Sequence, residues 1–264
     1  MVILLQVRGV EFTDQWVLLR SAIHSLTVSA QNLQRWQDPR LLEDCCVDVR
    51  GVGRFMVRKC CDDLWHVLPW REQCIADLLR RTLRPGDVFI DAGANIGVYT
   101  VLAAGLVGPT GSVIGIEMMP DTADRLEEHI RLNRLINVRV VRNALSETGG
   151  KTVFATVQAE KFGQATIATD SAQYGLGDKV AVKTMTLDAI TEGLPAVRMM
   201  KMDVEGAELS ALKGADSLLG RLSSLVYESW GHRREGGDTV DDLLRGKGFK
   251  VQQLDGSNRV AWRS

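Results

Sequence analysis

The chain has 264 residues, of which 45% are hydrophobic and 25% charged, so it is long and apolar enough for one large globular domain or one domain with an appendage. Its formal net charge of -1 argues against a strongly basic surface for nucleic acid. No apolar run approaches the roughly 20 residues that a membrane-spanning helix needs, so we predict no membrane contact.

An apolar residue recurs every three or four positions near the N-terminus, which predicts a helix that ends before Pro39. The residues of this seam are Phe12, Trp16, Leu19, Ile23, Leu26, Ala30 and Leu33. We expect the helix to pack on the main domain through the seam. The alternative is a homodimer contact or a substrate lid, since a narrow apolar stripe suits a helical partner.

Two smaller elements are predicted before the main domain. Residues 45–59 have the alternating apolar residues and the glycines of a strand-and-turn unit, and a helix is predicted from Trp70 to Arg81. The run Arg84-Pro85-Gly86 then interrupts the chain. We therefore expect an N-terminal helical and β extension over residues 1–80, serving substrate or assembly, and a main domain over residues 81–264.

The cysteines and the N-terminus indicate a cytoplasmic protein. The five cysteines are Cys45, Cys46, Cys60, Cys61 and Cys74. Their spacing does not match the C-x-x-C of zinc sites and the histidines form no ligand pair, so we predict no metal and reduced thiols. The apolar segment 1–7 lacks the basic region and the cleavage site of a signal peptide.

From Asp87 onward, strand and helix patterns alternate, which predicts a parallel sheet with right-handed crossovers. The predicted strands are 87–91, 112–117, 137–142, 197–203 and 223–229, and the predicted helices are 96–106, 120–134, 205–213 and 238–247. An insertion follows the third strand, with strands at 151–157 and 179–185 joined by a loop. The end of the chain, 249–262, has the pattern of an antiparallel hairpin with Asp255-Gly256 near its turn.

An acidic residue lies at the end of four predicted parallel strands. These residues are Asp91, Glu117, Asp203 and Glu228. Because the carboxyl ends of parallel strands share one edge of the sheet, we expect the four acids along one edge, where open α/β sheets bind ligands.

The loop after the first of these strands, Asp91-x-Gly93-x-x-x-Gly97, differs from the dinucleotide fingerprint G-x-G-x-x-G. A carboxylate in this loop would repel phosphate and attract a cation, which favours S-adenosylmethionine, a ligand with an ammonium, a sulfonium and a ribose diol. Glu117 lies 20 residues beyond Gly97, as expected for an acid that accepts hydrogen bonds from ribose hydroxyls. Asn143 either reads an adenine edge or forms a turn.

Several segments together resemble the FkbM family of S-adenosylmethionine-dependent methyltransferases. They are Asp91-Ala-Gly-Ala-Asn-Ile-Gly97, Ala144-Leu-Ser-Glu-Thr-Gly149, Leu187-Asp188, Lys201-Met-Asp-Val-Glu-Gly-Ala-Glu208 and Leu212-Lys-Gly214. The resemblance covers roughly residues 80–255 and implies an α/β class I methyltransferase (Rossmann-like) fold, a seven-stranded mostly parallel sheet whose last strand is antiparallel. It agrees with the hairpin at the end of the chain.

The resemblance also implies site residues and a reaction. The cofactor positions are Asp91, Gly93, Asn95, Gly97, Glu117 and Asn143. Asp203 is expected beside the methionine moiety and the reacting centre. Members of this family methylate hydroxyl oxygens of sugars, macrolides and other secondary metabolites, and some act on carboxylates, so we expect a small-molecule acceptor.

An alcohol must lose its proton when it is methylated, so a general base is expected. The residues that could serve are Asp203, Glu205 and His232, the last in the loop after the fifth strand. Asp203, Glu205 and Glu228 could alternatively hold Mg²⁺, although no feature of the sequence requires a metal. The alternative functions are a nucleic-acid (RNA) methyltransferase and a catalytically silent binding or assembly protein of the same fold.

Overall fold

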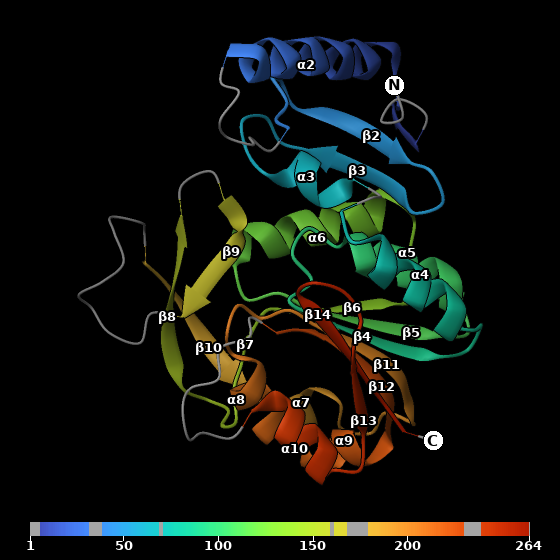
Figure 1. The fold of residues 1–264 in the computed structure, drawn as a ribbon, viewed down its shortest axis with the longest axis vertical. Coiled ribbons are helices and arrows are strands. Elements are labelled where there is room, and N and C mark those ends of the chain that lie inside the picture. Colours follow the sequence, from blue (N-terminus) through green and yellow to red (C-terminus); the bar gives the residue numbers. More distant parts are fainter. Residues whose placement is uncertain are drawn as a thin grey trace.

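The computed structural model describes residues 6–31, 39–68, 71–158, 161–167, 179–229 and 239–263, and its centre is a seven-stranded sheet (Figure 1). The strand order is β13-β14-β12-β11-β4-β5-β6. In chain order these strands are β4 (Val88–Ala92), β5 (Ser112–Ile116), β6 (Val138–Val141), β11 (Val197–Met202), β12 (Leu222–Glu228), β13 (Lys250–Gln253) and β14 (Asn258–Trp262).

The sheet has the predicted topology. Strands β6, β5, β4, β11 and β12 pair in parallel, and β14 pairs antiparallel with both β12 and β13. This confirms the class I methyltransferase fold with its antiparallel last strand. The strand order reverses direction between β4 and β11, so the ligand crevice is expected at the carboxyl ends of these two strands.

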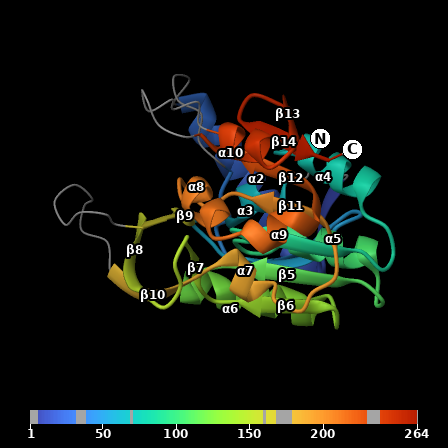
Figure 2. The ribbon, with the colours of Figure 1, turned by 90° about the horizontal axis from the view of Figure 1, so that it is seen from below.

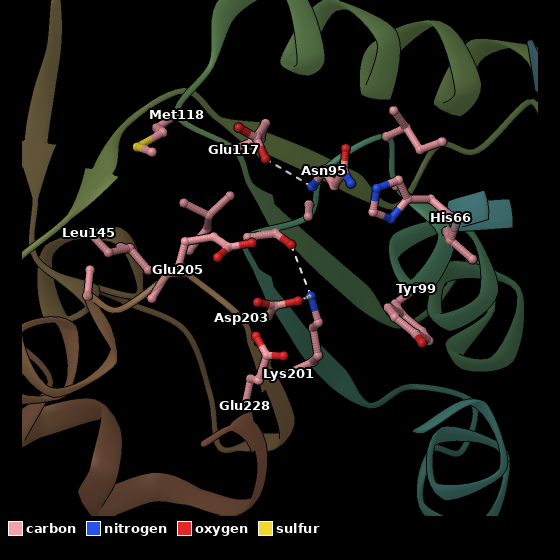
Figure 3. Close-up of a pocket in the computed structure, with 18 of the residues that line it drawn as sticks. His66, Asn95, Tyr99, Glu117, Met118, Leu145, Lys201, Asp203, Glu205 and Glu228 are labelled. Atoms are coloured by element: carbon pink, nitrogen blue, oxygen red, sulfur yellow. Dashed lines mark hydrogen bonds and ion pairs between the residues drawn. The ribbon is translucent and has the colours of Figure 1, made fainter. Parts of the chain in front are cut away.

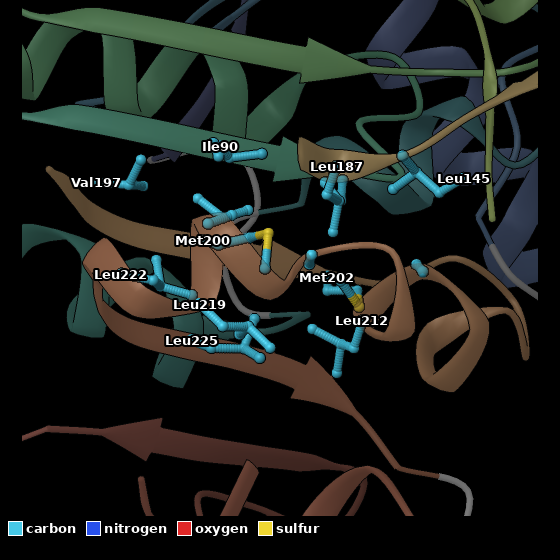
Figure 4. Packing of buried hydrophobic residues seen from close by; sticks show 14 of the residues in the cluster. Ile90, Leu145, Leu187, Val197, Met200, Met202, Leu212, Leu219, Leu222 and Leu225 are labelled. Carbon is cyan, nitrogen blue, oxygen red and sulfur yellow. The ribbon is translucent and has the colours of Figure 1, made fainter. Parts of the chain in front are cut away.

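Helices cover both faces of this sheet, as Figures 1 and 2 show. They are α4 (Gln73–Thr82), α5 (Val98–Val107), α6 (Pro120–Leu132), α7 (Leu187–Ile190), α8 (Glu208–Lys213), α9 (Asp216–Arg221) and α10 (Val240–Gly246). Neighbouring strand residues alternate between the faces: Phe89 and Met199 pack with α4 and α5, and Ile90 and Met200 pack with α7 to α10 (Figure 4). Both faces are therefore buried, which explains the continuous apolar strands. Among the described helices, none combines the length and the apolar character needed to cross a lipid bilayer.

The N-terminal unit is a three-stranded antiparallel sheet with helices around it. Its elements are β1 (Val7–Gly9), α2 (Phe12–Gln31), β2 (Cys45–Val49), β3 (Gly53–Val57) and α3 (Asp63–Val67). The unit joins the main sheet through α6, where His129 contacts the main chain of Met56 and of Ile96 at 3.0 Å and 2.7 Å. The strand-and-turn unit at 45–59 is confirmed, and the predicted helix 70–81 is observed as α4.

Helix α2 faces the opposite way from the expectation. The seam residues from Phe12 to Leu26 point away from the protein, with Phe12 78% and Leu26 70% exposed. On the other face, Leu18 is buried with residues of β1 and β2, and Ser21 accepts the Leu42 amide at 3.0 Å. The prediction that the seam packs on the main domain is wrong, because the periodicity fixes a helix but not the face that its sheet covers. Leu33 lies outside the described residues.

The insertion forms a second sheet with strand order β7-β10-β8-β9. Its strands are β7 (Ala144–Leu145), β8 (Thr152–Gln158), β9 (Lys161–Ile167) and β10 (Lys179–Met185). The two predicted strands of the insertion are confirmed, but the predicted loop between them contains β9. The helix predicted at 205–213 begins at Glu208, because Glu205 and Gly206 have φ of 51° and 94° and form a turn.

Candidate functional site

A pocket opens at the carboxyl ends of β4, β5, β11 and β12 (Figure 3). The glycine loop, defined as residues 93–97, forms one wall together with Glu117 and Met118. Lys201, Asp203, Glu205 and Glu228 line the pocket from β11 and β12 and the turns that follow them. The N-terminal side contributes His66, Arg71 and Glu72. Of the four acids expected along this edge, Glu117, Asp203 and Glu228 therefore line one pocket.

The glycine loop has no free cradle for a phosphate. The amides of Gly93 and Ala94 both donate to the Ile116 carbonyl, at 3.0 Å and 2.9 Å. The Asn95 amide donates to Glu117 Oε2 at 2.9 Å, and the Gly97 amide donates to the Ala94 carbonyl. Because four of the five amides of this loop already donate within the protein, the loop does not present the row of free amides that holds the pyrophosphate in a dinucleotide fold.

The two glycines of the loop are required by packing. A Cβ built on Gly93 would lie 1.7 Å from the carbonyl oxygen of Asp203, and one on Gly97 would lie 2.3 Å from Leu126 Cδ1. Both residues also have positive φ, 74° and 93°. Their backbone lines the pocket, but the missing side chains make room for β11 and α6 rather than for the ligand.

Two backbone amides hold the carboxylate of Glu117 in place. Its Oε2 accepts the Asn95 N–H and its Oε1 accepts the Met119 N–H, each at 2.9 Å. Burial raises the pKa of Glu117, and these two N–H groups oppose the rise. A carboxylate offers about four lone-pair positions, so two acceptor positions remain for the hydroxyls of a ribose.

Asp91 lies behind the pocket and does not line it. The residue is 0% exposed, and its Oδ2 accepts the Thr100 hydroxyl at 2.7 Å. Burial raises the pKa of Asp91, and the ammonium of Lys201 opposes the rise from 3.9 Å. The cation beside Asp91 in this structure is thus a residue of the chain, and direct contact of Asp91 with the cofactor stays a prediction.

Lys201 is a site residue that sequence reasoning missed. It lies in β11 opposite Asp91 and is 5% exposed. Its Nζ donates to the Gly93 carbonyl at 3.0 Å and lies 3.4 Å from Asp203 Oδ2. Burial lowers the pKa of Lys201, but the charges of Asp203 and Asp91 outweigh burial, so its pKa is raised and it stays charged. The available signal was a lone lysine within an apolar central strand, which needs acidic partners.

Asp203 and Glu228 form a coupled carboxyl pair in the pocket. Burial raises the pKa of Glu228, and the adjacent Asp203 raises it further. Burial also acts to raise the pKa of Asp203, but Lys201 and a hydrogen bond from Glu228 outweigh it, so the pKa of Asp203 is lowered. The pair therefore holds one proton, on Glu228, while Asp203 stays ionised.

Glu205 lines the pocket in the turn after β11, between Asp203 and Glu208 in the chain. Burial, together with the charges of Asp203 and Glu208, raises its pKa to about 7. The carboxylate of Glu208 is held by the main chain, because its Oε1 accepts the amides of Val204 and Gly206 in the turn before α8. Among the residues predicted to serve as the base, Glu205 is thus the described carboxyl whose pKa is raised to near neutral pH. His232 lies outside the described residues.

The remaining predicted cofactor residues fit S-adenosylmethionine. Asn95 Oδ1 is buried beside the pocket and has no hydrogen-bond partner among the described residues, so it can accept from an ammonium or a hydroxyl. Asn143 lines the pocket and uses its Nδ2 to donate to the Lys183 carbonyl at 3.0 Å, which leaves its Oδ1 for a ligand. A pocket rich in carboxylates, with an unpaired amide oxygen, suits a ligand that carries two positive charges.

The alternative Mg²⁺ site gains no support from the described residues. Within them, the one group of three whose ligand atoms lie within 4.8 Å of one another is Cys61, Asp62 and Asp63, away from the predicted acids. Both carboxylate oxygens of Asp63 already accept from the guanidinium of Arg58, at 2.7 Å and 2.8 Å. The absence of a metal in the reaction stays a prediction.

Comparisons with known proteins identify related methyltransferases. A family model described as "Methyltransferase FkbM domain" matches residues 91–251. "Hexuronic acid methyltransferase AglP" of Haloferax volcanii is 28% identical over 181 residues, which cover 67% of this chain and 70% of the relative. "Methyltransferase sdnD" of Sordaria araneosa is 28% identical over 212 residues, which cover 67% and 78%.

Among solved structures, methyltransferase FkbM from Methylobacillus flagellatus aligns with a TM-score of 0.46 and 18% identity, over 75% of this chain and 53% of that chain. The family match includes the glycine loop, Glu117 and Asp203. It leaves out His66, Arg71 and Glu72, which line the same pocket.

Proposed function

The chain belongs to the FkbM family of S-adenosylmethionine-dependent methyltransferases, and we propose that it methylates an oxygen of a small molecule such as a sugar or a secondary metabolite. The observation that carries this proposal is Glu205, a pocket carboxyl whose pKa is raised to about 7. An oxygen acceptor must lose a proton, and a base is most effective when its pKa lies near the working pH.

The names of the relatives support an oxygen of this kind. The Haloferax volcanii protein is named as a hexuronic acid methyltransferase, and a hexuronic acid offers both hydroxyl and carboxyl oxygens. The formal net charge of -1 argues against an RNA acceptor, whose phosphates require a basic surface. We therefore propose a sugar-like acceptor rather than a nucleic acid.

The bound cofactor would supply a methyl group on a positively charged sulfur. The chain would hold the acceptor in line with that methyl group, and such positioning contributes several kcal/mol to catalysis. Ionised Asp203, fixed by Lys201, would orient the acceptor and stabilise positive charge. Glu205 would take the hydroxyl proton. A carboxylate acceptor has no proton to lose and would not need this step.

The proposal is tested with cofactor labelled in its methyl group. We expect label in glucuronic acid, galacturonic acid or glucose, and mild base then distinguishes a labile methyl ester from a stable methyl ether. Asp203→Asn should abolish transfer, while Asp216→Asn, which alters an exposed ion pair with Lys247, should not. Label in total RNA and in no sugar would contradict the proposal.

We also propose that the outward face of α2 pairs with the same face of a second copy. The seam Phe12, Trp16, Leu19, Ile23 and Leu26 is exposed and has the alternating four- and three-residue spacing of a coiled coil. The flanking Thr13, Gln15, Ala22 and Thr27 are uncharged, and Arg20 is paired with Glu43 in its own chain at 3.0 Å, so two such faces would not repel each other.

Light scattering tests this dimer. The full chain should have twice the monomer mass, and Trp16→Glu with Ile23→Glu should give a monomer, while Arg131→Glu on the exposed side of α6 should change nothing. A monomeric wild-type chain at about micromolar concentration would contradict the proposal.

We propose a cytoplasmic location as well, which the five free cysteines support because thiols stay reduced there.

A further inference from the structure

The N-terminal unit places a guanidinium in the methyltransferase pocket. Arg71 lines the pocket with a side chain that is 27% exposed. Its Nη1 lies 2.8 Å from His66 Nδ1 and 3.6 Å from Glu72 Oε2. The Nε and Nη2 donors have no partner in the part of the chain that the structure describes. Arg71 therefore keeps donors for a ligand.

Arg71 is held in place by two supporting contacts. Because arginine stays protonated, His66 Nδ1 must be the acceptor, so His66 Nε2 carries the hydrogen and donates to Asp62 Oδ2 at 3.3 Å. On the other side, Glu72 accepts the Tyr99 hydroxyl at 2.7 Å. His66 therefore acts as a positioning residue for Arg71 and has no lone pair left to serve as a base.

The charges around the pocket limit what Arg71 can bind. Most ionisable residues that line the pocket are acidic, and they would repel an anion from most of its surface. The other lysine or arginine among the described lining residues, Lys201, is already surrounded by the Gly93 carbonyl and two carboxylates. The Arg71 corner is thus the place in the described pocket where a negative group is stabilised.

We propose that Arg71, positioned by His66, is a carboxylate-binding subsite that the N-terminal unit adds to the pocket. The planar guanidinium matches a carboxylate in a two-point contact, and a singly charged carboxylate suffers less repulsion from the surrounding acids than a phosphate. This inference rests on the proposed function. The carboxylate is either that of the cofactor's methionine moiety or that of a uronic acid acceptor.

Titration calorimetry distinguishes the two sources. If the cofactor supplies the carboxylate, Arg71→Gln should weaken binding of S-adenosylhomocysteine by about 10- to 100-fold and leave binding of 5′-methylthioadenosine, which lacks the carboxylate, unchanged. If the acceptor supplies it, S-adenosylhomocysteine affinity should be unchanged. Binding of glucuronate to the protein saturated with S-adenosylhomocysteine should then fall by a similar factor, and glucose should be unaffected.

Matched variants separate this role from a loss of folding. Arg80→Gln removes an exposed arginine of α4 that pairs with Asp77, and it should leave every affinity unchanged. His66→Leu should lose part of the affinity that Arg71→Gln loses. His66→Asn should bind the ligand as the wild type does, because its amide oxygen can still accept from Arg71. Circular dichroism checks that each variant is folded.

The proposal is overturned if Arg71→Gln is folded and binds S-adenosylhomocysteine and glucuronate as the wild type does. An Arg71→Gln protein with weakened S-adenosylhomocysteine binding, alongside a wild type that methylates no sugar, would instead support the subsite and contradict the proposed acceptor class. The two failures are therefore distinguishable.

Discussion

Replacing Lys201 with methionine should cost the protein a large part of its stability. The variant keeps the volume of the side chain but leaves Asp91, which is 0% exposed, without its counter-ion. At the observed separations of 3.9 Å to Asp91 and 3.4 Å to Asp203, the attraction is about 4 and about 5 kcal/mol for an effective dielectric constant of about 20. The desolvation of the lysine offsets part of this. Removing one partner of a buried pair costs a net 3–5 kcal/mol, roughly.

Urea unfolding followed by far-ultraviolet circular dichroism measures this effect. With a slope of about 3 kcal/mol per molar urea, the midpoint of Lys201→Met should fall by at least about 1 M with little change in slope. Asp91→Asn in the same chain should recover much of the loss, because the buried charge is then absent. A Lys201→Met midpoint equal to that of the wild type would refute the reasoning.

The pH dependence of the variant gives a second check. Without Lys201, burial should raise the folded-state pKa of Asp91 further above its unfolded value. A group whose pKa is raised in the folded state makes its full contribution to stability at pH values below its unfolded-state pKa. That contribution is lost as pH rises through the folded-state pKa. The stability difference between the wild type and Lys201→Met should therefore be smaller at about pH 5 than at about pH 8. A difference that grows on acidification would contradict the buried ion pair.

Three further predictions concern the cofactor, the base and the metal. Glu117→Gln should weaken S-adenosylhomocysteine binding by about 10-fold or more in calorimetry, while Glu127→Gln on the exposed side of α6 should not. If Glu117→Gln binds as tightly as the wild type, Glu117 does not bind the ribose. The rate with a hydroxyl acceptor should rise as pH increases through about 7, because Glu205 must lose its proton. The rate of Glu205→Gln should not show this rise. A pH profile that is the same in both proteins would place the base elsewhere. Activity should survive excess chelator; loss that added Mg²⁺ restores would support the metal site instead.

The main sheet could be predicted because its signals are local. Apolar runs separated by helical patterns give parallel strands, and the acids that follow them mark one edge, as Asp203 and Glu228 show. The short strand β1 was missed because its partner β2 lies about 40 residues further along the chain. The strand β9 was missed although its partner β8 is adjacent, because its Gly, Gln, Ala and Thr residues have the composition of a loop. For α2 the spacing of the apolar residues predicted a helix. The face of α2 that is buried depends on packing against β1 and β2, and no local pattern encodes that packing.

The sequence predicted the pocket residues that the main sheet supplies and missed those that the N-terminal side supplies. Asp91 lies near the carboxyl end of β4, and Glu117 and Asp203 follow β5 and β11, so the topology of one sheet brings the three together. His66 and Arg71 come to the same pocket from the N-terminal side, where the unit packs on α6 through contacts distant in the chain, such as that between Met56 and His129, 73 positions apart. Lys201 carried a signal, because a charge in an apolar central strand requires partners, but its partners are identified only by the register between β11 and β4.

The two strongest sequence signatures are linked by one contact, and this limits what they can reveal. Gly93 has no room for a side chain because the carbonyl of Asp203 occupies that space, and Lys201 closes the same junction by donating to the Gly93 carbonyl. The segments around residues 93 and 203 therefore depend on each other whatever the acceptor is. A match over 91–251 identifies this junction and the methyl donor that it serves. Arg71, which lines the pocket from the N-terminal side, lies outside that match. The match therefore does not decide whether Arg71 binds the carboxylate of the cofactor or that of the acceptor, and only the binding experiments on Arg71→Gln do.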